Sequence, residues 1–396
     1  MIDFRNPYTP GAGVMPKYLA GRDELLQSAN RSLQAISQGY AARSVVYYGL
    51  RGVGKTVILN ALESYADDLG MLVRHIEVKE DPGSFVRALS TACNAFVLNL
   101  SARETFKNAA AKLLSVVKSF TATWNPSDST LSLELSADAF SSATAGSGDL
   151  SNDLTEVMVA LGGYAAKAES AICFCVDEIQ YARPDELEAL IAALHRVNQL
   201  GLPIIFFCAG LPKILKEMGD AKSYTERLFE FIEVDSLDRE GASKAIVEPA
   251  ASLGVTFDLA AIDAVLDATG CYPYFIQELC STIWELCSGN QVSIDMVRSC
   301  IDSANVRLDE GFFRVRYSRC TQREQEFLIA MVKCGELPCT LANVAANMDR
   351  PTKSIAPFRA KLISKGIIFA AGRGEVDFTV PKFDEFLKRE LPGVFI

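Results

Sequence analysis

The sequence predicts an α/β fold: a parallel five-stranded sheet sandwiched by helices, then an all-helical domain, then a C-terminal domain of three helices and a hairpin. Short apolar segments alternate with helix-period segments over the first 235 residues, which is typical of a parallel sheet with helices on both faces. Only helix-period segments follow, and two short strands around a glycine turn come near the end. We therefore expect domains at 1–235, 236–307 and 308–396.

The elements are expected in a simple order. Residues 1–20, rich in Pro, Gly and Tyr, read as an extended arm. Strands are expected at 44–48, 71–78, 171–176, 203–209 and 230–234. Helices are expected at 20–38, 57–69, 84–100, 103–120, 154–168, 186–200 and 223–229, and in the second domain at 239–251, 259–269, 272–288 and 294–304.

Residues 101–153 read as an insertion between sheet elements. The strict alternation at 129–136 suggests a strand, and the small polar residues at 136–153 suggest a mobile loop. The amphipathic helix at 103–120 could receive a partner, but packing on its own domain is the simpler interpretation. No chemical role follows from this segment.

A phosphate-binding loop is predicted where the first strand ends. The stretch from Gly49 to Thr56 fits G-x-x-x-x-G-K-[ST] between a β-branched strand and a helix. Lys55 should reach the β- and γ-phosphates, and Thr56 should bind Mg²⁺. The alternative is a glycine-rich turn with an incidental Lys-Thr. The expected nucleotide contacts on the loop are Gly49, Leu50, Arg51, Gly52, Val53, Gly54, Lys55, Thr56 and Val57.

Two acids follow the apolar strand at 171–176. Asp177 and Glu178 should stand at the carboxyl edge of the sheet, where nucleotides bind in open α/β folds. We expect Asp177 to hold Mg²⁺ and Glu178 to activate the attacking water as a catalytic base. The alternative is a strand that ends at a charged turn.

A third catalytic candidate is Arg227, just before the last strand of the sheet. It could reach the γ-phosphate on a neighbouring subunit. The alternative is a surface arginine paired with Glu226 or Glu230.

Together these features resemble the AAA+ P-loop ATPases, within them the archaeal-type ATPase group, related to the origin-recognition initiator and STAND signalling ATPases. The finer resemblance rests on four motifs: Gly21-Arg22-Asp23, Asp177-Glu178-Ile179-Gln180, Gly210-Leu211-Pro212 and Gly270-Cys271-Tyr272-Pro273. It implies sheet order 5-1-4-3-2, a helical lid at 236–307, and ATP with Mg²⁺ at the core–lid junction. It adds Gly21, Arg22 and Pro273 to the nucleotide contacts.

The sequence departs from this family at two places. The fourth strand ends in Cys208-Ala209-Gly210, where the family usually has a polar sensor, often Asn. The lid has no arginine between Pro273 and Arg298, where initiator ATPases have a second sensor. Both departures favour slow hydrolysis, with the nucleotide acting as a conformational latch.

The C-terminal domain is expected to be a winged helix-turn-helix, because helices at 321–333, 341–348 and 352–365 precede a hairpin at 367–380. Its third helix carries positive charge without an acid, and Arg373 lies at the tip of the wing, which suits phosphate contacts. Contact with protein, through a solvated basic face, is an equally good interpretation. The expected DNA contacts are Arg350, Lys353, Arg359, Lys361, Lys365 and Arg373.

Composition limits the function classes. The net charge is −10 overall, which argues against a protein that coats nucleic acid, although residues 308–396 hold 14 Lys and Arg against 11 Asp and Glu. The 11 cysteines include no C-x-x-C, and neither a secretory signal nor a membrane-spanning stretch is recognisable. We expect a cytoplasmic protein.

The leading hypothesis is an ATP-binding, slowly hydrolysing ATPase that assembles into homo-oligomers and acts as a nucleotide-gated switch on DNA or a DNA-bound partner. The second hypothesis is a STAND-like signalling switch whose winged helix contacts protein. The third is a nucleotide-binding scaffold without hydrolysis, which the intact Glu178 disfavours.

Overall fold

The computed structural model describes the chain except residues 1, 3, 12, 102–106, 126–144 and 396. Contacts between residues divide the chain into two compact units. The sheet unit contains Arg22–Gly49 and Lys55–Val234. The C-terminal unit contains Met1–Gly21, Leu50–Gly54 and Asp235–Ile396. The short loop Leu50–Gly54 therefore belongs, by its contacts, with the C-terminal part of the chain.

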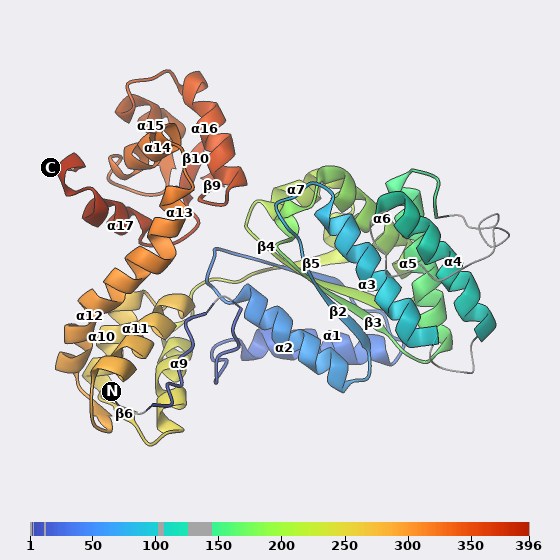
Figure 1. Ribbon diagram of the computed structural model, residues 1–396, viewed down its shortest axis with the longest axis horizontal. Coiled ribbons are helices and arrows are strands. Elements are labelled where there is room, and N and C mark those ends of the chain that lie inside the picture. The colour runs from blue at the N-terminus through green and yellow to red at the C-terminus, as the bar shows by residue number, and fades with distance from the viewer. Residues whose placement is uncertain (1, 3, 12, 102–106, 126–144, 396) are drawn as a thin grey trace. The chain divides into compact units, whose positions relative to one another are not determined.

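The sheet unit is built on a five-stranded, all-parallel sheet (Figure 1). Its strand order is β2-β3-β4-β1-β5, the order that the family resemblance implied. β3 and β4 are buried along their whole length, as expected for central strands covered on both faces. The strands are β1 (Ser44–Tyr48), β2 (Leu72–Glu77), β3 (Ile172–Asp177), β4 (Ile204–Gly210) and β5 (Phe229–Glu233).

Helices cover both faces of this sheet, which confirms the predicted fold class (Figure 1). Aromatic side chains lie between them and the strands: Phe174 stacks on Phe206 at 4.5 Å between ring centroids and meets Phe96 edge-on at 5.3 Å. The helices are α1 (Asp23–Ser37), α2 (Lys55–Asp68), α3 (Ser84–Ser101), α4 (Lys107–Trp124), α5 (Leu150–Lys167), α6 (Pro184–Gln199), α7 (Ile214–Ala221) and α8 (Thr225–Leu228).

Two predictions for the sheet unit are corrected. The loop expected at 136–153 ends earlier, because Asp149 caps α5: its side chain accepts a hydrogen bond from the N–H of Asn152 at 3.1 Å, and the helix begins at Leu150. Helix α7 was not predicted at all. The expected strand at 129–136 lies outside the described residues.

The C-terminal unit begins with four long helices around their own core. The N-terminal arm packs on them, since Tyr8 is buried and its hydroxyl donates to the carbonyl of Ile246 at 2.5 Å. A two-stranded parallel sheet was not predicted and makes the expectation of a purely helical region wrong. The elements are α9 (Arg239–Ala251), β6 (Thr256–Phe257), α10 (Leu259–Thr269), α11 (Pro273–Leu286), β7 (Gln291–Val292) and α12 (Ile294–Leu308).

The helical backbone continues past the boundary expected near Leu308. A π-helical segment, Asp309–Phe313, and α13 (Arg314–Ser318) follow directly on α12. Phe312 and Phe313 are both buried in an aromatic cluster with Phe275, which anchors this segment.

Three helices and an antiparallel hairpin follow, at the places predicted from the sequence. Strand β10 pairs with both β9 and β8 in a three-stranded sheet, and a further helix, α17, was not predicted. The elements are α14 (Gln322–Val332), β8 (Cys339–Thr340), α15 (Leu341–Asn347), α16 (Thr352–Ser364), β9 (Ile368–Gly372), β10 (Glu375–Phe378) and α17 (Phe383–Glu390).

Candidate nucleotide-binding site

The glycine-rich loop connects β1 to α2, as the motif requires. The N–H of Gly49 donates to the carbonyl of Gly210 at 3.2 Å, which fixes the start of the loop to the end of β4. Gly52 and Gly54 have φ of +89° and +96°, values that favour glycine. Lys55 Nζ donates to the carbonyl of Gly49 at 2.9 Å, so the ammonium group folds over the loop.

The loop threonine and the first strand acid meet. Thr56 Oγ1, in the first turn of α2, donates to Asp177 Oδ2 at the end of β3 at 2.6 Å. These residues are 121 positions apart in the sequence. The parallel sheet brings them together because α2 packs beside β3. Val57 follows in the same turn of α2.

Glu178 is held by its neighbours in an unusual backbone conformation. Its φ is +53°, in the left-handed region that non-glycine residues rarely adopt. Its N–H donates to Asp177 Oδ1 at 2.8 Å. The side-chain amide of Gln180 donates to Glu178 Oε2. A costly backbone conformation beside a carboxylate marks this turn as a functional-site candidate.

Gln180 occupies the end of β4, where the sequence has no polar residue of its own. It is 2% exposed, and its Oε1 accepts a hydrogen bond from the N–H of Leu211 at 3.0 Å. A Cβ at Gly210 would come within 2.9 Å of this oxygen, so glycine leaves room for the amide. Sequence reasoning missed Gln180 as a site residue, although the DEIQ motif contains it.

The remaining predicted contacts are spread over both units. Arg22 precedes α1 in the sheet unit, whereas Gly21 and Pro273 belong to the C-terminal unit. Gly21 packs closely there: a Cβ would lie 3.1 Å from the Cα of Gly241. Pro273 is the first residue of α11, where its missing N–H costs nothing.

Arg227 is exposed in α8, immediately before β5. Neither Glu226 nor Glu230 pairs with it, and we find no ion pair for it elsewhere in the described chain. The described part of the chain therefore gives no support to the alternative of a surface salt bridge.

The basic residues of the C-terminal region differ in their surroundings. Lys353 and Lys361 on α16 and Arg373 in the hairpin turn are exposed, whereas Arg350 and Arg359 are half-buried. Lys365 Nζ binds the buried carboxylate of Glu324 at 2.6 Å, so we leave it out of the proposed nucleic-acid contacts.

Thr56 and Asp177 fit a Mg²⁺ ion. The hydroxyl and the carboxylate converge on one place, and both are the hard oxygen ligands that Mg²⁺ prefers. Mg²⁺ in nucleotide sites is commonly held by one or two protein groups together with phosphate oxygens and water. Within the described residues, no group of three or more His, Cys, Asp or Glu could hold a metal by itself.

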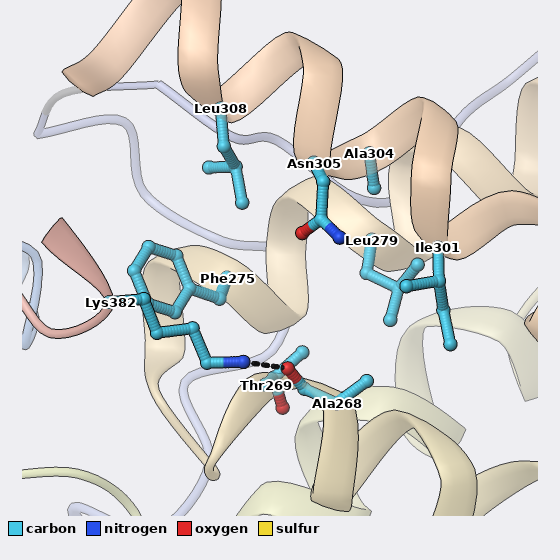
Figure 2. A pocket seen from close by; sticks show the side chains of 9 residues that line it. All are labelled: Ala268, Thr269, Phe275, Leu279, Ile301, Ala304, Asn305, Leu308 and Lys382. Carbon is cyan, nitrogen blue, oxygen red and sulfur yellow. Dashed lines mark hydrogen bonds between the residues drawn. The ribbon is translucent and has the colours of Figure 1, made fainter. Parts of the chain in front are cut away.

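A separate small pocket lies in the C-terminal unit (Figure 2). Apolar side chains such as Phe275 and Leu279 form most of its wall, and Asn305 and Lys382 add polar groups. Lys382 Nζ donates to the carbonyl of Ala268, so a positive charge stands at the C-terminal end of α10. No residue of the phosphate-binding loop lines this pocket.

Two protein families match this chain. Residues 18–207 match the AAA ATPase domain, and residues 310–387 match a domain of unknown function (DUF8462). No curated protein matches. No helix in the described parts of the chain is both long and apolar enough to cross a membrane.

Solved structures from several organisms are similar to this chain. A Walker-type ATPase of Pyrococcus abyssi is 12% identical, with 98% of this chain and 99% of that chain covered and a TM-score of 0.55. The Orc1 protein of Aeropyrum pernix, solved in complex with DNA, is 15% identical, with 95% and 94% covered and a TM-score of 0.47. The RuvB Holliday junction branch migration motor of Thermotoga maritima is 16% identical, with 95% and 98% covered and a TM-score of 0.46.

The sheet order, the loop and the family match agree on the class of protein. Residues 18–207 form an AAA ATPase domain, which confirms the AAA+ resemblance. The fold is that of a P-loop ATPase, and the domain family is that of residues 18–207.

Proposed function

We propose that this protein binds ATP with Mg²⁺, hydrolyses it slowly, and acts as a nucleotide-gated oligomeric switch on DNA or on a DNA-bound partner. The hydrogen bond between Thr56 and Asp177 carries the proposal. It joins the phosphate-binding loop to the acid of β3, so that both oxygen groups lie where one metal ion could bind them.

The proposed roles follow from the positions of the side chains. Lys55, above the loop, binds the β- and γ-phosphates. Glu178 accepts a proton from the attacking water, while Gln180 orients its carboxylate. Bound Mg²⁺ would neutralise charge on the phosphate oxygens. Arg227, exposed before β5, would stabilise the transition state on a neighbouring subunit.

We propose slow turnover because few polar side chains at the end of β4 would be free to contact the γ-phosphate of a bound ATP. β4 ends in Cys208-Ala209-Gly210, and the amide of Gln180 at that place is already bound to Glu178 and Leu211. A site that binds well but stabilises the transition state poorly holds its nucleotide for long periods. That behaviour suits a switch better than a motor.

DNA contact is proposed for the exposed side chains of Lys353, Lys361 and Arg373. α16 contains no acidic residue, which favours phosphate contact. The second candidate is a signalling switch whose C-terminal domain contacts protein. The engagement of Lys365 with Glu324 favours this second candidate, because it leaves one cation fewer for DNA.

The test of the catalytic proposal measures ATP turnover and ATP affinity in Lys55→Ala and Glu178→Gln. We expect each to reduce turnover by about 100-fold or more. Lys55→Ala should also weaken ATP binding, whereas Glu178→Gln should preserve it. Lys79→Ala, at an exposed position outside the site, serves as the control. Wild-type turnover in both site variants would contradict the proposal.

A second measurement separates the two candidate functions. Binding to duplex DNA is measured over a range of salt concentrations, without nucleotide and with a slowly hydrolysed ATP analogue. If the protein contacts DNA, the logarithm of the binding constant should fall linearly with the logarithm of the salt concentration. The magnitude of this slope should become smaller by about one in each of the variants Lys353→Ala and Lys361→Ala. A slope near zero favours the protein-contacting switch. Mass determination in the same solutions reports the number of subunits in the assembly.

A further inference from the structure

Two buried cysteines of the C-terminal unit lie side by side where α11 packs against α12 (Figure 1). The Sγ atoms of Cys287 and Cys300 are 3.7 Å apart, close enough for a weak hydrogen bond between the thiols. Their side chains are 8% and 1% exposed, and both belong to the core of the four-helix region. Because the sulfur atoms of a disulfide are about 2.0 Å apart, an approach of about 1.7 Å would bring the two thiols to bonding distance.

Cys287 is the thiol with room to move. It follows α11 as the C-cap residue, with an extended backbone at φ −88° and ψ 172°. The turn after it contains Gly289 with φ +95°, and a Cβ there would meet nothing within 4 Å. Cys300 lies near the middle of α12, where the hydrogen bonds of the helix hold the backbone in place. A shift of the chain that follows α11 can therefore close the gap between the sulfur atoms while α12 stays where it is.

The surroundings of the pair determine how it can react. Burial, and then the hydrogen bond with Cys300, raise the pKa of Cys287, so only a small fraction is the reactive thiolate at neutral pH. Cys287 is the more exposed of the two thiols, so a small oxidant reaches it first. The pair is not part of a metal site, since no cluster of three or more potential ligands occurs in the part of the chain that the structure describes. We therefore expect slow oxidation that begins at Cys287.

We propose that Cys287 and Cys300 form a reversible disulfide, which joins the end of α11 to α12, when the protein meets a small disulfide such as oxidised glutathione. The Cys287 thiolate attacks one sulfur of the small disulfide, forms a mixed disulfide and expels one small thiolate. The Cys300 thiolate then attacks the Cys287 sulfur and expels the second small thiolate. The two protein thiols are oxidised, the small disulfide is reduced, and the two protons of the protein thiols pass to the departing thiolates.

The disulfide would restrain the helix that leads out of the four-helix region. The helical backbone of α12 continues through the π-helical segment Asp309–Phe313 into α13. The two cysteines are 13 positions apart, and the loop that they close contains β7. Closing a loop of this length stabilises the fold mainly by restricting the unfolded chain. This inference does not rest on the proposed function, because it involves no nucleotide.

The test incubates the folded full-length protein with excess oxidised glutathione, blocks the remaining thiols and digests the protein without reductant. Cleavage after Glu285, Arg298 and Arg307 leaves Cys287 and Cys300 on separate fragments that contain no other cysteine. We expect these two fragments to be joined, with a mass lower by two hydrogen atoms than their sum, and to separate on reduction. If they stay separate after prolonged incubation, or if Cys287 carries only glutathione, the proposal is wrong.

Thermal unfolding measures the restraint, followed through Trp284 in a Trp124→Phe background. The Tm of the oxidised protein should exceed that of the reduced protein by roughly 5–10 °C. Cys287→Ser, at the more exposed position, should abolish both this rise and the joined fragments. Cys280→Ala removes a fully buried thiol of α11 and should preserve both, so it is the matched control. Joined fragments without a rise in Tm would contradict the restraint on α12, and a rise that persists in Cys287→Ser would contradict the assigned pair.

Discussion

The side-chain amide of Gln180 donates a hydrogen bond to Glu178 Oε2 and accepts one from the N–H of Leu211 at 3.0 Å. A single buried glutamine thus joins the acid after β3 to the residue after β4. This contact places the Gln180 amide directly beside the carboxylate that we propose as the catalytic base.

Gln180→Glu should therefore change the pH dependence of turnover. A second carboxylate beside Glu178 would favour protonation of the pair, because two like charges at this distance repel. We expect the acidic limb of the pH–rate profile to move up by about one unit and turnover at pH 7 to fall several-fold. Gln199→Glu, at an exposed position on α6, is the matched control. An unchanged acidic limb would show that Gln180 does not act on Glu178.

Arg227→Ala should reduce turnover by about 10³-fold while preserving ATP affinity, because a residue that acts across an interface does not hold the nucleotide in its own subunit. Mixing provides the sharper measurement. The Arg227→Ala variant keeps an intact nucleotide-binding site, whereas the Lys55→Ala variant keeps the arginine that would act on the neighbouring subunit. Mixed oligomers of the two inactive variants should regain part of the wild-type activity. Mixed assemblies without recovered activity would contradict a role in trans.

The features that the sequence predicted well are local in the chain. A strand, a glycine loop and a helix lie within 44–68, and the loop pattern constrains all three. The position of Asp177 could be predicted for a similar reason, because the apolar strand β3 ends there and places it at the carboxyl edge of the sheet.

The features that the sequence did not predict depend on distant partners or weak local signals. Gln180 contacts Leu211, 31 residues away, and no local pattern reveals that pairing. Helix α7 has only eight residues and includes Gly219, which reads as a break. Gly311 also reads as a break, so the sequence did not predict that the helical backbone continues past α12. The buried Phe312 and Phe313 hold that segment in place.

Glu186→Ala should destabilise the sheet unit. Glu186 is fully buried, and its carboxylate accepts from the N–H of Arg183 at 2.8 Å and of Val86 at 3.2 Å. Its removal leaves two helix-terminal N–H groups without acceptors, at a cost of roughly 2–4 kcal/mol. Glu188→Ala, half-exposed on the same helix, is the control.

Fluorescence can follow the unfolding of each unit separately in this chain. Trp124 lies in the sheet unit and Trp284 in the C-terminal unit, and the sequence has no other tryptophan. In a Trp284→Phe background, urea unfolding of Glu186→Ala should show a lower midpoint than that of Glu188→Ala. Equal midpoints would mean that the two N–H groups find other acceptors.

Glu324→Gln should destabilise the C-terminal unit in a pH-dependent way. Burial alone would raise the pKa of Glu324, but hydrogen bonds from Lys365 and Thr321 outweigh it, so the net pKa is lowered. A carboxyl group whose pKa is lower in the folded state stabilises the fold above its unfolded pKa, and that contribution is lost as pH falls through the folded value. We expect a loss of about 2–3 kcal/mol in the free energy of unfolding at pH 7.

The difference between wild type and Glu324→Gln should shrink as the pH falls below about 4.5. Unfolding is followed through Trp284 in a Trp124→Phe background. Glu326→Gln provides the control, because its pair with Arg323 is exposed and should contribute less than about 1 kcal/mol. A destabilisation by Glu324→Gln that is the same at pH 7 and pH 4 would mean that the buried ion pair with Lys365 contributes no stability beyond a neutral hydrogen bond.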